Sequence, residues 1–262
     1  MNILVTINHA YFPYLISMLR SLIYFNKVNI NLFVISNDIK ISDFDIYINY
    51  LKNININIIK FDNSLLALAP TSKRYPKTIY YRLFAFKVLP LYIKRILYLD
   101  PDIIINGDLS SFYNMDLSNI AFIGATNIKE PLRKFNEIKN KAPKGAPYVN
   151  TGVLLMNLSY LRANTNEQAI YDYIAERHLF FTLPDQDIIS ALYGNHIKLV
   201  PAEIYNLSDR GIKFHNLYNN LKIDLAWVKE NTKIIHYYGK NKPWHQNYRG
   251  ILQGFYERFK VS

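Results

Sequence analysis

Runs of residues that are apolar at every position, rather than at alternate positions, are the feature that most constrains the fold of this chain. Each run is short and rich in Ile, Leu and Val, and helical patterns lie between the runs. A strand that is apolar on both faces must be covered on both faces, which favours an α/β fold with a mostly parallel sheet flanked by helices. The predicted strands are Asn2 to Ile7, Asn31 to Ser36, Ile56 to Phe61, Arg95 to Leu99, Ile120 to Gly124 and Val153 to Leu158.

Helical periodicity is clearest after Pro13, where apolar residues recur at three- and four-residue spacing and form one face of a helix. Further helices are predicted from about Glu167 to His178 and from near Asp185. The segment 127–148 is polar, lysine-rich and interrupted by prolines, so we predict a long surface loop there. Such loops often close over binding sites, which makes this segment a candidate lid.

The composition excludes several kinds of site. The 262 residues include no cysteine, so a disulfide, a thiolate metal site and a thiol nucleophile are all excluded, and any metal must use oxygen and nitrogen ligands. The first residues lack the basic region of a secretory signal, and no stretch approaches the ~18 uninterrupted apolar residues of a membrane-spanning helix. We therefore expect a cytoplasmic protein.

The net charge of +11 indicates a polyanionic partner, which could be a nucleic acid, an anionic membrane surface or a phosphorylated substrate. The segment 229–262 carries seven Lys or Arg residues against two Glu, interleaved with Tyr, Trp and Phe. Basic residues mixed with aromatic ones suit peripheral contact with the inner face of a membrane, although a solvated basic end has the same composition.

No glycine follows the first predicted strand, which runs into Asn8-His9-Ala10-Tyr11. Neither a G-x-G-x-x-G turn nor a P-loop can therefore bind a diphosphate there through bare backbone amides. If this sheet binds a nucleotide, another group must meet the charge of its phosphates. A divalent cation is the obvious candidate.

The sequence Asp100-Pro101-Asp102 directly follows the apolar run that ends at Leu99. Both carboxylates therefore emerge at the carboxyl end of a buried strand, where open α/β sheets bind their ligands. Two residues apart in an extended chain, they project to the same side and can share one cation. The other D-x-D pairs, at residues 43–45 and 185–187, do not end an apolar strand, and the first is better explained by helix capping.

Two further segments add polar groups that suit a phosphate and a metal. His236 follows an apolar strand, with Gly239 and Lys242 three and six positions later. An imidazole beside two carboxylates shifts the preference from Mg²⁺ towards Mn²⁺. Arg82 precedes the D-x-D strand and could contact a phosphate or orient a carboxylate. Taken alone, His236 is better explained as a structural histidine and Arg82 as part of a surface salt bridge.

With these elements in order, the sequence resembles glycosyltransferase family 8, which contains bacterial lipopolysaccharide galactosyl- and glucosyltransferases and glycogenin. The segments that carry the resemblance are NILVTINHAYFPYLISMLRSL, YYR, LYLDPDIIINGDLSSFYNMDL, YVNTGVLLMNL, LPDQDIISALY and IIHYYGKNKPWH. The resemblance spans nearly the whole chain. It implies a GT-A fold, with a single Rossmann-like nucleotide-binding domain over residues 1–228 and a C-terminal segment 229–262 that carries a metal and diphosphate motif.

The resemblance also implies a site. Its metal, Mn²⁺ or failing that Mg²⁺, would be held by Asp100, Asp102 and His236. The residues expected around the donor, UDP-glucose or UDP-galactose, are Thr6, Ile7, Asn8, Tyr11, Arg82, Asp100, Pro101, Asp102, Asn150, Thr151, Gly152, Gly239 and Lys242. Gln186 and its neighbour Asp185 are expected at the reacting carbon. The chain departs from the family pattern at Asn8, His9 and Asn127, where acidic residues are usual in bacterial relatives.

The reaction expected from the resemblance is transfer of a hexose, with retention of configuration, to a glycan, glycolipid or protein-linked acceptor. Because an amide, Gln186, stands where a glycosidase would have a carboxylate nucleophile, front-face attack is favoured. A nucleotidyltransferase would also use paired carboxylates at a strand end. A non-catalytic basic module that binds membrane or nucleic acid would explain the net charge but not the pair of aspartates. For the glycosyltransferase that the resemblance implies, we expect no nucleic-acid partner.

Overall fold

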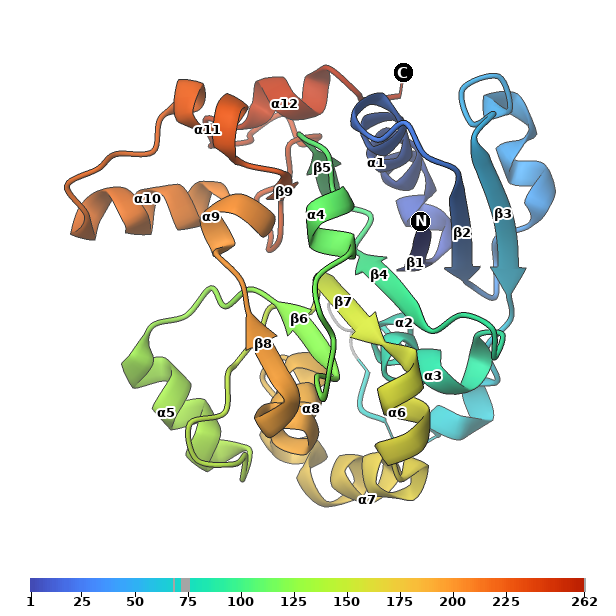
Figure 1. The fold of residues 1–262 in the computed structure, drawn as a ribbon, viewed down its shortest axis with the longest axis vertical. Helices are drawn as coiled ribbons and strands as arrows, with labels where there is room; N and C mark the ends of the chain where they lie inside the picture. The colour runs from blue at the N-terminus through green and yellow to red at the C-terminus, as the bar shows by residue number, and fades with distance from the viewer. Residues whose placement is uncertain (68, 72–75, 262) are drawn as a thin grey trace.

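A seven-stranded sheet with the order β3-β2-β1-β4-β7-β6-β8 forms the centre of the chain (Figure 1). The computed structural model describes residues 1–67, 69–71 and 76–261. The strands are β1 Asn2–Thr6, β2 Ile30–Ile35, β3 Ile54–Ile59, β4 Arg95–Leu99, β6 Phe122–Gly124, β7 Val153–Asn157 and β8 Ile197–Leu199. Strands β3, β2, β1 and β4 are parallel, as are β6 and β8, while β7 is antiparallel to β4 and β6. The prediction of a mostly parallel sheet is confirmed.

Helices cover both faces of this sheet, as the apolar strands require. Along β1, Ile3 and Val5 pack in one buried cluster with residues of α1, whereas Leu4 packs in another with residues of α8. The α-helices are α1 Phe12–Phe25, α2 Thr78–Tyr81, α3 Ala85–Val88, α4 Ser110–Tyr113, α5 Glu130–Lys139, α6 Leu158–Asn164, α7 Glu167–Arg177, α8 Pro184–Tyr193, α9 Ala202–Tyr205, α10 Asp209–Tyr218, α11 Leu225–Asn231 and α12 Gln253–Glu257. Short 3₁₀ helices are η1 His9–Tyr11, η2 Ile41–Tyr47, η3 Asn63–Leu66, η4 Arg82–Phe84, η5 His178–Phe180 and η6 Gly194–His196.

A two-stranded antiparallel ladder joins distant parts of the chain. It pairs β5 (Ile103–Ile105) with β9 (Ile234–His236), so that Ile103 lies opposite His236. A third buried cluster surrounds this ladder and combines Ile104 with apolar residues of α10 and of the C-terminal segment. Figure 1 shows β5 and β9 side by side, between α9 and α1. The ladder therefore connects the D-x-D region to the end of the chain.

The aromatic side chains of residues 229–261 turn inward. Tyr237, Tyr256 and Phe259 are buried in the third cluster, and Trp244 is stacked on Tyr14 of α1 with ring centroids 3.6 Å apart. The basic residues of this segment are therefore not accompanied by exposed aromatic rings. No helix in residues 1–67, 69–71 and 76–261 is both long enough and apolar enough to cross a membrane.

The segment 127–148 differs from the long loop that we predicted, because it contains the ten-residue helix α5. Pro131 lies in the first turn of this helix, where its missing N–H costs nothing. Arg133 forms ion pairs with Glu130 and Glu137, one turn away on either side. These local interactions stabilise a helix that the polar, proline-containing sequence concealed.

The end of α5 and the residues after it are tied to α8 by a buried carboxylate. Asp187 is fully buried and accepts hydrogen bonds from Asn140 Nδ2 and Tyr148 Oη, both at 2.8 Å. Lys139 Nζ adds an ion pair at 3.0 Å. The segment 127–148 is thus anchored at one helix, while the idea that it acts as a lid stays a prediction.

Candidate metal centre and donor site

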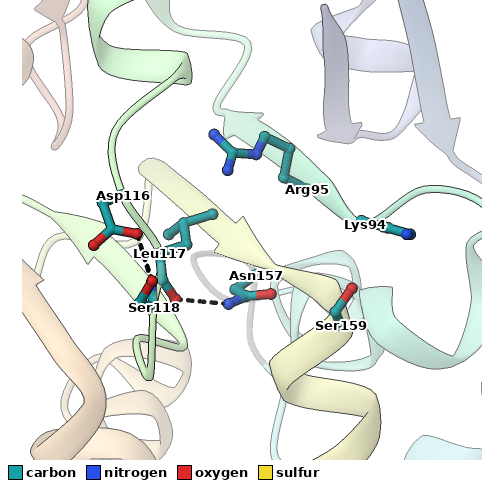
Figure 2. Close-up of a pocket in the computed structure, with 7 residues that line it drawn as sticks. All are labelled: Lys94, Arg95, Asp116, Leu117, Ser118, Asn157 and Ser159. Atoms are coloured by element: carbon teal, nitrogen blue, oxygen red, sulfur yellow. Dashed lines mark hydrogen bonds between the residues drawn. The ribbon is translucent and has the colours of Figure 1, made fainter.

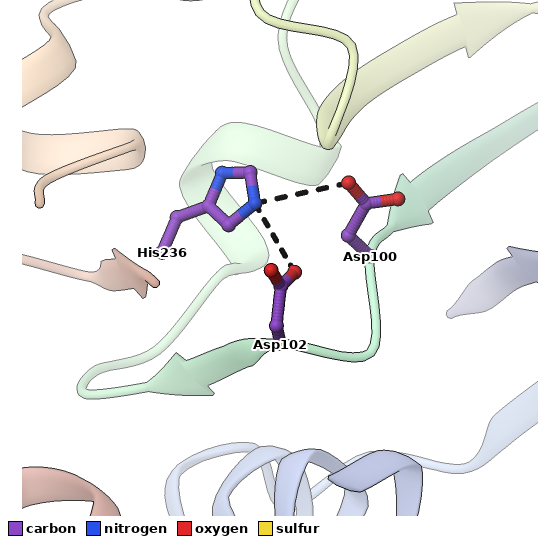
Figure 3. A group of neighbouring side chains, drawn as sticks. All are labelled: Asp100, Asp102 and His236. Carbon is purple, nitrogen blue, oxygen red and sulfur yellow. Dashed lines mark ion pairs between the residues drawn. The ribbon is translucent and has the colours of Figure 1, made fainter. Parts of the chain in front are cut away.

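Three predicted metal ligands converge at the carboxyl end of β4 (Figure 3). One ligand atom from each of Asp100, Asp102 and His236 lies within 4.8 Å of the other two. His236 Nε2 is 3.2 Å from Asp102 Oδ1 and 3.7 Å from Asp100 Oδ2. Pro101, between the two aspartates, is buried. The spacing of two carboxylates around one imidazole nitrogen suits a single divalent cation.

The topology explains why these residues meet. Asp100 follows β4, Asp102 precedes β5, and the β5–β9 register places His236 opposite Ile103. The carboxyl ends of β1, β4 and β6 and the start of β7 lie at the same edge of the large sheet, because β7 alone among these four is antiparallel. Residues 6–8, 100–102, 125–127 and 150–152 therefore border one region.

The imidazole of His236 is oriented for a metal by hydrogen bonds on its far side. Asn206 Nδ2 donates to Asn150 Oδ1 at 3.0 Å, which identifies Asn206 Oδ1 as the oxygen facing the imidazole. His236 Nδ1 therefore donates to Asn206 Oδ1 at 2.9 Å, which leaves Nε2 as the ring nitrogen that faces the two carboxylates. Nε2 is buried and has no hydrogen-bond partner among the described residues. A buried ring nitrogen without a hydrogen-bond partner, beside two carboxylates, fits a site for a cation.

Other buried polar atoms without a hydrogen-bond partner gather at the same edge. In the described ranges they are Asn8 Oδ1, Arg82 Nε and Asn127 Nδ2, besides His236 Nε2, while a fifth such atom, Arg177 Nε, belongs to the end of α7. Burying a polar group without a partner is unfavourable, and in native proteins such groups are few. Their concentration around the metal centre indicates that a polar ligand completes their hydrogen bonding.

Arg82 is buried, not a surface salt bridge, with only 6% of its surface exposed. Its guanidinium lies 3.1 Å from Asp100 Oδ1 and 3.2 Å from Asp185 Oδ2, and it donates to the carbonyl of Thr151 at 2.9 Å. Burial opposes the charge, but Asp100, the ring of Tyr98 and Asp185 together raise the pKa of Arg82. The arginine therefore remains a permanent cation that links the metal ligands to α8.

Burial raises the pKa of the Asp185 carboxyl, although Arg82 and a hydrogen bond from Thr151 Oγ1 at 2.6 Å pull it down. Asp185 is thus a fully engaged carboxylate in an environment that disfavours its charge. Gln186, the next residue of α8, is half-buried. The structure brings Asp185 to the metal ligands through Arg82, and Gln186 adjoins it.

A chain of hydroxyl groups reaches Asp100 from β1. Tyr98 Oη donates to Asp100 Oδ1 at 2.6 Å, so Thr6 Oγ1, 3.0 Å from the same phenol oxygen, donates to it. Burial raises the pKa of Tyr98 well above its usual value, which keeps the phenol protonated. Tyr98 was not predicted as a site residue, because its position within an apolar strand gives no sign of a polar role.

Lys242 lies on the other side of the centre, where its ammonium pairs with Asp102 and donates to the carbonyl of Tyr237 at 2.9 Å. Burial would raise the pKa of Asp102, but Lys242 and His236 outweigh it and hold that pKa well below the usual value. Gly239 has φ of +91°, a conformation that side chains disfavour, and this allows the turn between His236 and Lys242.

The residues predicted for uridine are at the same edge but are less enclosed. Ile7 is buried, and Tyr11 is 37% exposed with its edge towards Trp244, at a centroid separation of 6.4 Å.

Asn206 and Asp187 are polar residues that sequence reasoning missed as supports of the site. No local pattern could have revealed Asn206, whereas Asp187 was noted only as part of a D-x-D match.

Gly152 makes room for the centre, because a Cβ there would lie 2.6 Å from Asp100 Oδ2 and 2.9 Å from His236 Nε2. We expect Gly152→Ala to weaken Mn²⁺-dependent nucleotide binding by at least about a hundredfold, since it displaces two ligands at once. Titration calorimetry measures this. Gly254→Ala is the matched control, because a Cβ at Gly254 meets nothing within 4 Å. Equal affinities in the two variants would contradict the assignment.

A separate pocket lies at the opposite end of β4 and does not contribute to the centre (Figure 2). Arg95 opens β4 and pairs with Asn157 at the end of β7, so this pocket is at the edge remote from Asp100. Asp116 there accepts hydrogen bonds from the backbone and hydroxyl of Ser118. The pocket is lined by Lys94, Arg95, Asp116, Leu117, Ser118, Asn157 and Ser159.

Solved structures with the same architecture include the galactosyltransferase LgtC in complex with donor and acceptor sugar analogs, with a TM-score of 0.82 and 20% identity. The superposition covers 99% of this chain and 95% of LgtC. The glycosyltransferase GlyE of Streptococcus pneumoniae TIGR4 matches the whole chain, with a TM-score of 0.73, 22% identity and 60% of its own length covered. The fold is thus that of the GT-A class of glycosyltransferases. The sequence model of Glycosyl transferase family 8 matches residues 2–248, and the chain belongs to that family.

Curated relatives share the family at moderate identity. The lipopolysaccharide 1,2-glucosyltransferase of Escherichia coli K12 is 29% identical over 199 residues, which are 74% of this chain. A putative glycosyltransferase of Haemophilus influenzae is 27% identical over 263 aligned residues, covering 94% of this chain and 73% of the relative. The chain spans 56% of the length of the Escherichia coli relative. The chain and these relatives therefore share a family.

Proposed function

We propose that this protein transfers glucose or galactose from a UDP-sugar to a glycan acceptor, with retention of configuration and with Mn²⁺ as its preferred metal. The observation that carries the proposal is His236 Nε2, which is buried beside Asp100 and Asp102 without a hydrogen-bond partner among the described residues. Two carboxylates and one imidazole suit Mn²⁺ better than Mg²⁺. When bound, the cation would neutralise the diphosphate and act as a Lewis acid on the leaving group.

The remaining site residues have complementary roles in this proposal. Lys242, and Gly239 through its backbone, would contact the diphosphate at the edge of the centre, and Tyr11 would stack on the uracil base. The residues that would surround the sugar and uridine are Thr6, Ile7, Asn8, Arg82, Pro101, Asn150, Thr151, Gly152, Asp185 and Gln186. Residues 1–228 would thus bind most of the donor, while the segment 229–262 would add His236 and Lys242.

Charge stabilisation accounts for catalysis in this site. As UDP departs, negative charge grows on its β-phosphate and the sugar becomes oxocarbenium-like, so fixed cations aimed at the phosphate lower the barrier. Arg82 and Lys242 are buried at the centre, where Arg82 pairs with Asp100 and Asp185 and Lys242 pairs with Asp102. Asp185 is already engaged by Arg82 and Thr151, which disfavours it as a nucleophile.

We therefore expect front-face attack beside Gln186, with the leaving phosphate taking the acceptor proton. Mass spectrometry of the protein quenched during turnover should detect no covalently bound hexose. Gln186→Ala should lower the transfer rate about tenfold to a hundredfold while leaving UDP affinity within about threefold, because an amide near the reacting carbon acts mainly in the transition state. A hexose attached to Asp185 or any other side chain would refute this mechanism.

A donor screen tests the proposed function without knowledge of the acceptor. UDP-glucose and UDP-galactose are incubated with the protein, with and without Mn²⁺, and slow release of UDP by hydrolysis is measured. Release that depends on Mn²⁺ and on one of the two sugars supports the proposal. Pyrophosphate release from UTP in the presence of a sugar phosphate would indicate a nucleotidyltransferase instead.

The acceptor that we propose is a lipopolysaccharide or another lipid-linked glycan. The support is the family and the similarity to a lipopolysaccharide 1,2-glucosyltransferase. Transfer of a radiolabelled hexose to delipidated or intact lipopolysaccharide tests this directly, with a protein-linked glycan as the competing acceptor.

A further inference from the structure

Exposed apolar side chains are concentrated on α5 and α10. On α5, Leu132, Phe135 and Ile138 recur every three residues and form one stripe, in which Ile138 is 78% exposed. The second stripe follows α10 and consists of Phe214, Leu217, Tyr218 and Leu221, all exposed. Exposed apolar side chains that are grouped together, and not scattered singly, indicate an interaction site. We call the two stripes and their basic neighbours the α5–α10 face.

Basic residues outnumber acidic ones on the α5–α10 face. Lys129, Lys134, Arg210 and Lys213 are exposed, and in the described part of the chain none of them has a carboxylate within ion-pair distance. The two glutamates of α5, at 130 and 137, both pair with Arg133, so these three side chains together carry one negative charge. The face therefore combines apolar stripes with unpaired cations.

A contact joins the two helices, and both follow segments of the chain that border the candidate metal centre. The ammonium of Lys129, at the start of α5, lies 2.9 Å from the ring centroid of Tyr218 and 5.7 Å from that of Phe214. Asn206, which orients His236, lies shortly before α10, and the strand β6 that ends at the centre leads into α5. Figure 1 shows both helices projecting from the same side of the sheet.

We propose that the α5–α10 face docks on the surface of an anionic phospholipid bilayer. Exposed Leu, Ile and Phe side chains can enter the boundary between headgroups and acyl chains, Tyr218 suits the headgroup level, and each nearby cation gains from anionic lipid. The net charge of +11 adds long-range attraction. The predicted membrane contact thus moves from the segment 229–262, whose aromatic rings are packed inside, to this face.

A second copy of the chain is a weaker candidate for the same surface. In a two-fold symmetric dimer, each subunit would present the same patch to its partner. Lys129, Lys134, Arg210 and Lys213 would then face their own counterparts, while Glu130 and Glu137 are already paired with Arg133. Like charges brought together in this way oppose association, whereas an anionic bilayer neutralises them.

Vesicle sedimentation tests the proposal without donor, acceptor or metal. The full chain is mixed with vesicles of phosphatidylcholine, with or without phosphatidylglycerol, and the bound fraction is measured at increasing salt. We expect binding only to the anionic vesicles, with affinity falling as salt rises. A variant with Leu132→Ser, Phe135→Ser and Leu217→Ser should bind at least tenfold more weakly, and so should Lys134→Glu combined with Lys213→Glu.

The helix η2 supplies the matched control. Ile46 and Ile48 are 77% and 60% exposed, but Asp43 and Asp45 accompany them, so this apolar surface suits an anionic bilayer poorly. Ile46→Ser with Ile48→Ser should therefore leave vesicle binding unchanged. Because all the changed residues are exposed, we expect each variant to fold, and circular dichroism checks this. No binding by the unmodified chain, equal loss in the control, or a dimer in light scattering that only the α5–α10 variants dissociate would overturn the proposal.

Discussion

Asp100→Asn and Asp102→Asn are each expected to slow UDP release from the donor by on the order of a thousandfold, and to remove Mn²⁺-dependent UDP binding. Lewis-acid stabilisation is worth several kcal/mol, and about 1.4 kcal/mol corresponds to a tenfold change in rate. An asparagine keeps the shape of the side chain but lacks the charge that holds a divalent cation. Because both aspartates lie at a strand end and the substitution conserves volume, we expect the fold to survive.

Calorimetry with UDP, in the presence and absence of Mn²⁺, is the decisive measurement for these two variants. Asp116→Asn provides the control, since Asp116 also caps a turn at a strand edge but lies in the pocket at the other end of the sheet. It should leave Mn²⁺-dependent affinity unchanged. Unaltered affinity in both Asp100→Asn and Asp102→Asn would show that the cation is bound elsewhere.

Arg82→Met should produce the largest loss of stability, about 3–5 kcal/mol at neutral pH. Removing one partner of a buried ion pair leaves the others uncompensated, and Arg82 serves both Asp100 and Asp185. Urea unfolding measures the change. Arg133→Met is the matched control, since Arg133 also pairs with two carboxylates but lies at the surface, where solvent screens the charges, and we expect a far smaller effect.

The loss in Arg82→Met should depend on pH in a defined direction. Burial raises the pKa of Asp185 even with Arg82 present, and without the arginine that pKa rises further. A carboxyl whose pKa is higher in the folded state than in the unfolded state favours folding when protonated, and this contribution disappears as the pH rises through the folded-state pKa. The variant should therefore approach wild-type stability on acidification. A difference in unfolding free energy between wild type and Arg82→Met that became larger at low pH would contradict the role assigned to Arg82.

The strand pattern and the metal ligands could be predicted because their physical signals are local. Continuous apolar runs identified β1, β2, β3, β4 and β7 to within a few residues, and two carboxylates at the end of such a run marked Asp100 and Asp102. His236 stood out by its place after an apolar strand, and family resemblance supplied its role. The convergence of these three side chains is confirmed by the structure.

Features that depend on tertiary contacts were less visible. The helix α5 depends on salt bridges at Arg133 and on anchoring at Asp187, neither of which a polar, proline-containing sequence reveals. The strand β8 is short and mostly exposed, so it lacks the apolar pattern of a buried strand. Asn206 orients His236 through a contact between residues thirty positions apart, and no spacing rule points to it.

The ladder between β5 and β9 also affects when the protein becomes active during synthesis. A ribosome completes the strand carrying Asp100 long before residue 236 leaves the exit tunnel, and closing such a long loop is slow. The nascent chain can form its first parallel strands while still lacking the imidazole. The three side chains of the candidate metal centre can therefore meet only after the chain has folded back through residue 236.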